Sequence, residues 1–348
     1  MSARRTGAAV AVAGAAAALV AGCGGSSSSP QGTTAAAAPA KAFVVLVTDV
    51  NQLNDHGFNQ LAYQGLKRAE RELGIRGAVY QSPSAQAYIP NLSQAARKGA
   101  DLVVSVGFDQ ATAVSKVAKQ FPKTHFAIID VDQTTLAGKP ANVEGLIFKE
   151  QEVGYLAGYL AGLVEKQKGG HVTISSVGGQ KQPPVDRYIA GYQAGAKKAD
   201  PTIKLLNAYS QDWVDQAKCK QVALDQIAAG ASIVFQVAGG CGLGALDAAK
   251  EKGVWGIGVD ADQSYLGSQI LTSAMKRVDT SVYTSIQQVL DGKFAGGTNA
   301  VFSLKNDGVG LGKISPKVSK ANVAKVEQIA KDVASGKIAN IPTEVAAG

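Results

Sequence analysis

The stretch that decides the fold is Val44 to Leu73, which reads VVLVTDVNQLNDHGFNQLAYQGLKRAEREL. It begins within an apolar run, residues 42–48, which predicts a strand covered by helices on both faces. It ends in residues 57–73, whose apolar side chains recur at helical spacing. The loop between them, residues 49–57, carries two Asp, two Asn and one His. Ligands of open α/β sheets bind beyond the carboxyl ends of the strands, so this loop is a candidate binding segment.

Two features of the loop leave alternatives open. Either Asn54 or Asp55 is placed to cap the following helix. Phe58 lies in the first helical turn, where its ring turns either to the core or to a ligand.

The rest of the chain repeats this rhythm of an apolar run followed by a helical pattern. Predicted strands are 42–48, 77–81, 102–106, 125–129, 143–148, 171–177, 203–209, 232–237, 254–259 and 270–275. Predicted helices are 57–73, 87–99, 109–120, 150–166, 185–199, 215–229, 243–252, 279–291 and 318–335. Alternation of this kind predicts an α/β protein with doubly wound parallel sheets. Residues 42–348 are long enough for two lobes, and about ten strands suit two sheets of five or six.

Several segments, in order along residues 43–312, resemble the basic membrane protein family of substrate-binding lipoproteins, which includes purine nucleoside receptors. They include Asp49 with Asn54 to Gln60, Val106-Gly107-Phe108, Gly154 to Gly162, Ala190 to Gly195, and Gly258 to Gln263. The resemblance implies a type I periplasmic-binding fold, with two parallel-sheet lobes joined by a multi-strand hinge. It implies an N-terminal lobe of residues 42–148 and 276–303 and a C-terminal lobe of residues 149–275 and 304–348.

The resemblance also implies a ligand between the lobes, with a nucleobase stacked between Phe58 and Trp213. Asp260 is expected to accept hydrogen bonds from ribose hydroxyls, and Lys276 to donate to ribose oxygens. The other residues expected to contact the ligand or shape its loops are Asp49, Asn54, Asn59, Gly107, Phe108, Asp109, Gly239 and Gly240.

One position departs from the family pattern. Thr112 stands where the family often has an acid, and Asp109 directly follows Phe108. Asp109 either substitutes for that acid or caps the next helix, so the identity of the base stays open.

The N-terminus predicts export and lipid anchoring. Arg4 and Arg5 precede an apolar run, residues 7–20, which is short for a membrane span. Val20-Ala21-Gly22-Cys23 resembles a bacterial lipobox, with Cys23 as the lipidated residue after removal of residues 1–22. The Gly-, Ser- and Ala-rich residues 23–41 predict a flexible tether. We therefore expect lipid anchoring on the extracytoplasmic face of the cell membrane. The resemblance implies a monomer that delivers its ligand to an ABC permease and ATPase.

The two remaining cysteines allow either one disulfide or two separate thiols. Cys219 lies early in a predicted helix and Cys241 follows the next predicted strand, and exported chains tolerate disulfides. With three His in the chain and no Cys-x-x-Cys spacing, we expect no metal site and no cofactor. The net charge of +8 is dispersed among acids, without a basic stripe carrying aromatics, so we expect no nucleic-acid partner.

Three other functions compete with the nucleoside receptor. Gly240-x-Gly242-x-x-Ala245 follows a predicted strand, with Asp260 twenty residues beyond the first glycine, as in a dinucleotide-binding site. This segment lies in mid-chain in an exported protein whose three histidines are isolated, so we expect no enzyme. A sugar receptor of the same fold is a nearer rival, because fold does not settle the ligand. A ligand-binding sensor without a transporter is the third.

Overall fold

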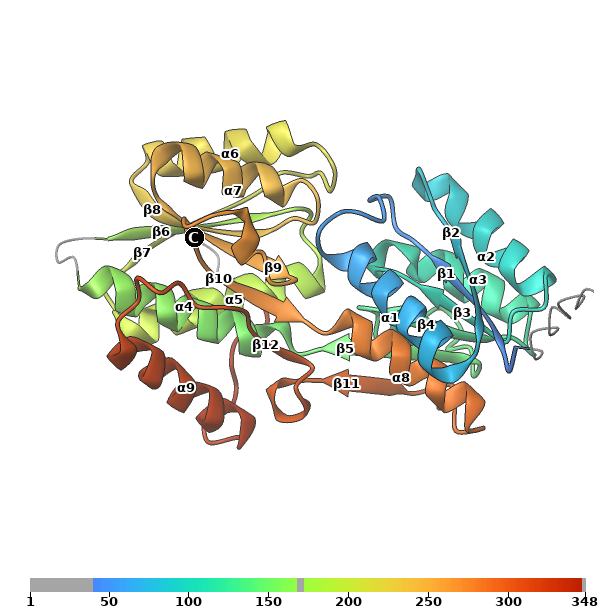
Figure 1. Cartoon of the computed structure of the whole chain (residues 1–348). Helices are drawn as coiled ribbons and strands as arrows, with labels where there is room; N and C mark the ends of the chain where they lie inside the picture. The colour runs from blue at the N-terminus through green and yellow to red at the C-terminus, as the bar shows by residue number, and fades with distance from the viewer. Residues whose placement is uncertain (1–39, 168–171, 346–348) are drawn as a thin grey trace, which may run out of the picture. The chain divides into compact units, whose positions relative to one another are not determined.

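The computed structural model describes residues 40–167 and 172–345, which form an α/β protein with two six-stranded sheets (Figure 1). The expected signal segment and Cys23 lie outside the described residues. Among the described residues, no helix is long and apolar enough to cross a lipid bilayer.

The first sheet is parallel throughout. Its strands, in order across the sheet, are β11 (Asn299–Phe302), β5 (Val143–Phe148), β4 (His125–Ile129), β3 (Leu102–Ser105), β1 (Phe43–Val47) and β2 (Arg76–Tyr80). The helices of this lobe are α1 (Phe58–Leu73), α2 (Tyr88–Arg97), α3 (Ala111–Gln120) and α8 (Val278–Leu290). Together these elements form the N-terminal lobe.

The second sheet has the same strand order as the first. Its strands are β12 (Val309–Leu311), β10 (Ile270–Lys276), β9 (Trp255–Asp260), β8 (Ala231–Val237), β6 (Thr173–Gly178) and β7 (Lys204–Tyr209). Only the β10–β12 pairing is antiparallel in this described sheet. The helices of this C-terminal lobe are α4 (Glu150–Lys166), α5 (Pro183–Ala199), α6 (Gln216–Ala228), α7 (Gly242–Lys252) and α9 (Lys320–Ala334). The expected type I periplasmic-binding architecture is therefore present.

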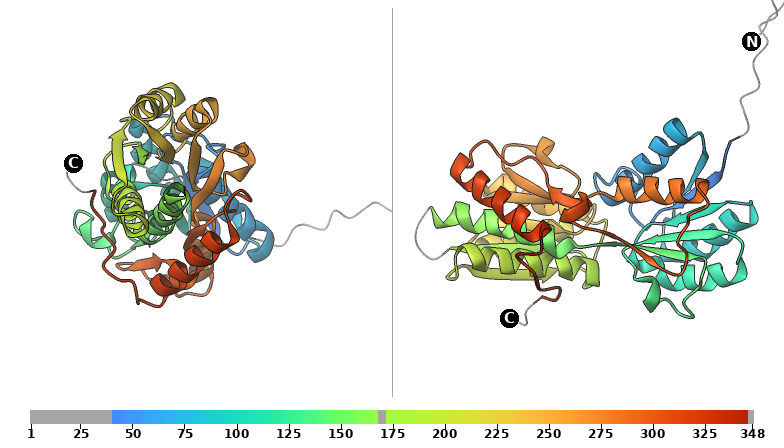
Figure 2. Two further views of the ribbon diagram at one scale, coloured as in Figure 1. Left: turned by 90° about the vertical axis from the view of Figure 1, so that its left-hand side faces the viewer. Right: turned by 90° about the horizontal axis from the view of Figure 1, so that it is seen from below.

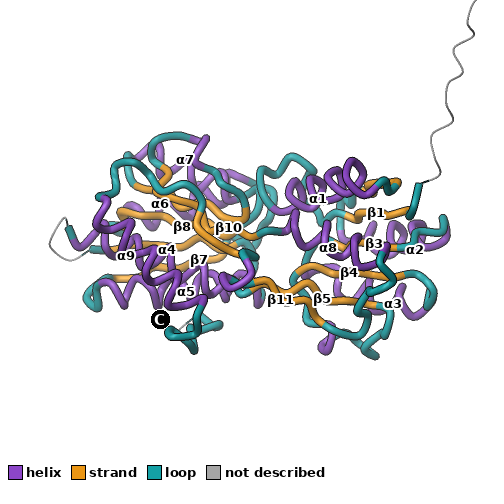
Figure 3. Tube along the Cα trace, turned by 60° about the horizontal axis from the view of Figure 1, so that its bottom comes forward, coloured by secondary structure: helices purple, strands orange, loops and turns teal. Residues whose placement is uncertain are grey.

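Helices cover both faces of each sheet (Figure 3). In β1, Val44 and Leu46 pack into a cluster with α1 and α8, whereas Val45 and Val47 pack into a cluster with α2 and α3. All four side chains are fully buried. Burial of each such side chain contributes about 1.5–3 kcal/mol to folding, which is why the strand is apolar on both faces.

The chain passes between the lobes after β5, after β10 and after β11 (Figure 2). The backbone N–H of Lys149 donates to Phe302 O at 2.8 Å, and that of Arg277 donates to Gly308 O at 2.9 Å. Neighbouring crossing segments are therefore hydrogen-bonded to each other, as expected of a multi-strand hinge. The expected lobe limits at residues 148 and 276 coincide with the ends of β5 and β10, and residue 303 directly follows β11.

Helices α4 and α5 approach each other unusually closely. A Cβ atom on Gly158 would overlap the carbonyl oxygen of Tyr192, and one on Gly195 would overlap that of Tyr155. The glycines thus let the two backbones touch. This packing fixes the first turns of both helices beside the crossing segments, where they carry charged side chains.

Candidate functional site

A cleft between the lobes is bounded by the carboxyl ends of strands from both sheets. It contains about 590 Å³ of space not filled by atoms, including the part open to solvent. Nine of the twelve expected contact residues line it: Asp49, Phe58, Gly107, Phe108, Asp109, Trp213, Gly239, Asp260 and Lys276. Sequence reasoning missed eight lining residues: Asn51, Asp130, Gln182, Pro184, Val185, Tyr188, Val237 and Val259.

The polar loop after β1 holds Asp49 at the edge of the cleft. Asp49 Oδ1 accepts hydrogen bonds from Asn51 N at 2.8 Å and from Asn59 Nδ2 at 2.5 Å. Burial raises the pKa of Asp49 to about 6, although the hydrogen bond from Asn59 opposes the rise. Because its amide is turned to Asp49 and Asn51 O, Asn59 lies outside the cleft and positions Asp49 instead.

Asn54, also expected to contact the ligand, is exposed and is not among the residues that line the cleft. Asp55, not Asn54, caps α1. Its carboxylate accepts hydrogen bonds from Gly57 N, Asn59 N and Gln60 N at 3.0, 2.8 and 3.1 Å. These three backbone groups have no partner within the helix, so the cap fixes the start of α1 and with it Phe58.

Aromatic side chains reach the cleft from both lobes. Phe58 comes from the first turn of α1, and a Cβ atom on Gly107 would lie 3.4 Å from its ring. Trp213 comes from the loop between β7 and α6, and a side chain on Gly179 would overlap its indole ring. Both rings are half-buried. Only the Trp213 ring needs a glycine beside it, so Gly179 sets how deeply the indole enters the cleft.

The floor of the cleft is a buried group of ions. Lys276 Nζ lies 2.6 Å from Asp130 Oδ1 and 2.9 Å from Glu150 Oε1, and Arg187 Nε lies 2.6 Å from Glu150 Oε2. Burial alone would lower the pKa of Lys276, but the carboxylates of Asp130 and Glu150 outweigh it and raise the pKa. Lys276, expected to bind ribose, is thus already held by two carboxylates, which leave part of its hydrogen-bonding capacity for a ligand.

Asp260 ends β9 in the left-handed backbone region, with φ at 63°. Its Oδ1 accepts a long hydrogen bond of 3.4 Å from the hydroxyl of Tyr188, and among the described residues it forms no ion pair. Burial raises the pKa of Asp260 to about 7; Lys276 opposes this and the Asp130 carboxylate adds to it. This buried carboxyl group, with few partners of its own, can accept hydrogen bonds from a ligand.

Hydrogen bonds join the two lobes across the cleft. Gln182 Nε2 and Trp213 Nε1 donate to the carboxylate of Asp109 at 2.6 and 3.2 Å, and Gly240 N donates to Asn51 Oδ1 at 3.4 Å. Asp109 provides no side-chain cap, so of its two expected roles the capping role is wrong. Gly240 lies outside the cleft lining, yet its N–H meets the opposite lobe.

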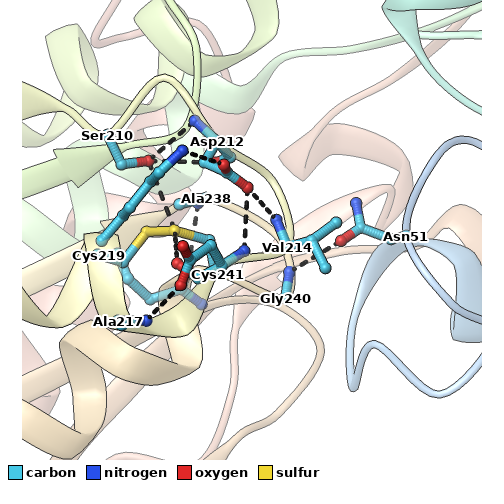
Figure 4. The surroundings of a disulfide bond; sticks show 12 residues. Asn51, Ser210, Asp212, Val214, Ala217, Cys219, Ala238, Gly240 and Cys241 are labelled. Carbon is cyan, nitrogen blue, oxygen red and sulfur yellow. Dashed lines mark hydrogen bonds and ion pairs between the residues drawn. A yellow bond between two sulfur atoms is a disulfide. The ribbon is translucent and has the colours of Figure 1, made fainter. Parts of the chain in front are cut away.

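Cys219 and Cys241 are joined in a disulfide, with their Cα atoms 5.6 Å apart (Figure 4). Cys219 lies in the first turn of α6, and Cys241 directly precedes α7. The bond is buried beside the loop that carries Trp213. Among the described residues, no group of three or more His, Cys, Asp or Glu side chains is arranged to hold a metal ion.

The sequence model of one protein family covers residues 42–343, and that family is described as Bmp, ABC transporter substrate-binding protein PnrA-like. The chain belongs to this family. Like the rest of the Bmp family, it is a substrate-binding protein of an ABC transporter and not an enzyme, with a small-molecule ligand and transporter subunits as partners.

Individual relatives agree with this assignment. The chain is 35% identical over 317 residues to the CD4+ T-cell-stimulating antigen of Listeria monocytogenes, spanning 85% of this chain and 87% of the relative. It is 35% identical over 321 residues to the ABC transporter nucleoside-binding protein BmpA of Lactococcus lactis subsp. cremoris, spanning 84% and 87%. An ABC transporter solute-binding protein from Aeropyrum pernix K1 superimposes with a TM-score of 0.76 at 27% identity, covering 86% of this chain and 94% of that one.

In this Bmp protein, the glycines that resemble a dinucleotide fingerprint serve packing. A Cβ atom on Gly242 would overlap the side chain of Gln236, and one on Gly244 would overlap the backbone of Gln216 in α6. Asp260, the acid expected for such a fingerprint, faces the interlobe cleft with Tyr188. Gly242 therefore lets the start of α7 lie against β8, and Gly244 lets α7 approach α6.

Proposed function

We propose that this protein is a lipid-anchored extracytoplasmic receptor that binds a nucleoside between its lobes and delivers it to an ABC permease. The observation that carries the proposal is that Phe58 and Trp213, from opposite lobes, line the same cleft as Asp260. Aromatic rings on both sides suit a planar base, for which stacking contributes about 1–3 kcal/mol. A buried carboxylate suits the neighbouring hydroxyls of a ribose, which are hydrogen-bond donors.

The charges of the cleft support a nucleoside over a nucleotide. Among the described residues, four carboxyl groups line the cleft, those of Asp49, Asp109, Asp130 and Asp260, and Lys276 is the one Lys or Arg in the lining. That ammonium is already paired with Asp130 and with Glu150 beneath it. A phosphate would therefore meet repulsion without a free cation, which costs binding energy in a partly buried site.

Lipid anchoring rests on the sequence Val20-Ala21-Gly22-Cys23 and on the Ala- and Ser-rich tether after it. A thioether-linked diacylglycerol with a further acyl chain provides the multiple chains that stable anchoring requires. Labelling of expressing cells with a radioactive fatty acid tests this directly: the wild-type chain takes up label, and Cys23→Ala does not. Equal labelling of both would overturn the anchor.

A thermal-shift panel on the mature chain tests the ligand class. The panel holds adenosine, guanosine, inosine, cytidine, uridine, free adenine, AMP, ribose, arabinose and glucose. A ligand at about one hundred times its Kd stabilises the folded state by about 2.7 kcal/mol. We expect such a shift with at least one nucleoside and a smaller one with AMP. A shift with a sugar and none with any nucleoside would defeat the proposal in favour of a sugar receptor.

A further inference from the structure

The disulfide lies where two walls of the cleft meet, and Cys241 contacts both of them. Figure 4 shows Cys219 and Cys241 between the loop of residues 210–215 and the turn at Gly240, with Asn51 of the other lobe reaching that turn. Both sulfur-bearing residues are fully buried.

The first wall is the loop that carries Trp213. The backbone N–H of Cys241 donates to Trp213 O at 2.8 Å. Farther along the loop, the carboxylate of Asp212 accepts hydrogen bonds from Val214 N and Asp215 N, both at 2.9 Å. Asp215 in turn caps α6 through Ala217 N at 3.0 Å, one turn before Cys219. The loop is therefore hydrogen-bonded to Cys241 at Trp213, and Asp215 joins its end to the helical turn that carries Cys219.

The second wall is the turn of Gly239 and Gly240. Gly239 has φ at 55° and lines the cleft. Gly240 directly precedes Cys241, and its N–H donates to Asn51 Oδ1 in the N-terminal lobe at 3.4 Å. Trp213 makes a second contact with that lobe, through Asp109. Two hydrogen bonds between the lobes therefore come from direct neighbours of Cys241. Gly240 precedes Cys241 in the chain, and the backbone oxygen of Trp213 accepts a hydrogen bond from the Cys241 N–H.

We propose that the Cys219–Cys241 disulfide is a positioning element of the ligand site, holding the Trp213 loop and the Gly239–Gly240 turn in register so that affinity depends on the bond. The proposal rests on the proposed nucleoside function. A link between the start of α6 and the start of α7 leaves the indole ring less freedom before the ligand arrives, so less ordering is required on binding. Without the link, the ligand would have to order that wall itself, and it would leave faster.

The competing explanation is that the bond contributes only stability. Cys219 and Cys241 belong to a buried apolar cluster that also contains Val177, Val234 and Ala245. Removing the bond therefore destabilises the lobe whether or not it positions the site. Val234→Ala provides a matched control, because it opens a space in the same cluster without touching the Trp213 loop or the Gly239–Gly240 turn.

The test compares the double variant C219A/C241A with V234A, both in a W255F background. The chain contains two Trp residues, so Trp213 is then the only one and reports on its own loop. Melting temperature, acrylamide quenching of Trp213 corrected for fluorescence lifetime, Kd and dissociation rate are measured. The probe is the nucleoside that gives the largest shift in the panel above.

We expect both variants to melt at lower temperature than the parent. C219A/C241A should bind at least tenfold more weakly, mainly through faster dissociation, and its Trp213 should be more accessible to acrylamide without ligand. In V234A, the Kd and the acrylamide quenching of Trp213 should both stay within twofold of the parent values. If C219A/C241A does not fold, C219V/C241A, which fills more of the cluster, replaces it.

Affinity and quenching in the disulfide-free protein within twofold of the parent would overturn the positioning role. Equal weakening in C219A/C241A and V234A would also overturn it, since loss of stability would then be sufficient. Failure of the proposed function gives a different result, because the parent protein itself would bind no nucleoside.

Discussion

Asp130 and Asp260 occupy equivalent places in the two lobes, yet their surroundings differ. Asp130 directly follows β4 and Asp260 ends β9, and each strand is third from the same edge of its sheet. Both residues have positive φ, 70° and 63°, and both are buried. Burial is the largest cause that raises the pKa of each. The fold thus places one carboxyl group from each lobe at the cleft in the same strained backbone conformation.

The difference lies in their partners. Asp130 has both carboxylate oxygens within 2.7 Å of Lys276 Nζ, whereas among the described residues the carboxylate of Asp260 accepts only the long hydrogen bond from Tyr188. Asp130 is therefore satisfied by the protein, and Asp260 is left for a ligand. One position in a repeated lobe is part of the buried ion group, and its counterpart is a candidate binding group. Variants that remove one carboxylate or its partner test this difference.

The largest effect should follow removal of the cation. Lys276→Met leaves Asp130 and Glu150 buried without their shared partner, and breaking a buried pair in this way costs about 3–5 kcal/mol. The free energy of unfolding, measured with urea, should fall by that amount. The control is Lys181→Met, because Lys181 pairs with Asp186 while its side chain is 62% exposed. That change should cost at most about 1 kcal/mol. Equal losses of unfolding free energy in the two variants would mean that the ion pairs of Lys276 stabilise the fold no more than an exposed pair does.

The next effect separates the two carboxylates. Asp260→Asn should weaken nucleoside binding about 100-fold, because charge-assisted hydrogen bonds contribute about 1.5–3 kcal/mol each and two ribose hydroxyls would lose one acceptor. Its stability at pH 8 should be unchanged or higher, since a buried charge without an ion-pair partner is removed.

The matched variant is Asp130→Asn, which should lose stability because Lys276 loses a carboxylate. Calorimetric titration and urea unfolding of both variants provide the comparison. Loss of binding in Asp130→Asn with full binding in Asp260→Asn would reverse the roles assigned here.

The sequence predicted the elements whose pattern is local. All ten predicted strands and nine predicted helices have counterparts among the described residues. Most of them could be predicted because short apolar runs and helical spacing are visible within a few residues of sequence. Strands β11 and β12 were missed. They are short, and their strand character depends on pairing with β5 and β10, from which they are remote in sequence. Local periodicity contains no signal for such pairing.

The site was predicted through family resemblance, and the missed residues fall into two kinds. Asp130 ends a strand that was predicted correctly, so its place at a carboxyl end was a usable signal. Tyr188 and Arg187 lie inside α5 and looked like helix residues, and only the close approach of α4 brings Arg187 to Glu150. Asn59 is the opposite case, a residue that was expected to contact the ligand. Its side-chain amide, in the first turn of α1, donates to Asp49 instead of facing the cleft.

The smallest effect should be a pH dependence in which stability and affinity change in opposite directions. Burial raises the pKa of Asp260 from 3.8 to about 7, so the folded protein holds the proton that the unfolded chain releases near pH 4. The stability from this group is fully present below about pH 4 and is lost as the pH rises through about 7. Binding requires the ionised carboxylate, so affinity should rise over the upper part of that range.

With a pKa near 7, about one tenth of Asp260 is ionised at pH 6, and affinity there should be about tenfold below its value at pH 8. The ligand-free melting temperature should fall from pH 4 to pH 7 over the same titration. Asp49, whose pKa is raised to about 6 by burial, would add a change in affinity centred one pH unit lower. Asp260→Asn distinguishes the two, because it should remove the change near pH 7 and leave any change near pH 6. A wild-type affinity that is constant from pH 6 to pH 8 would show that the ligand does not use the Asp260 carboxylate.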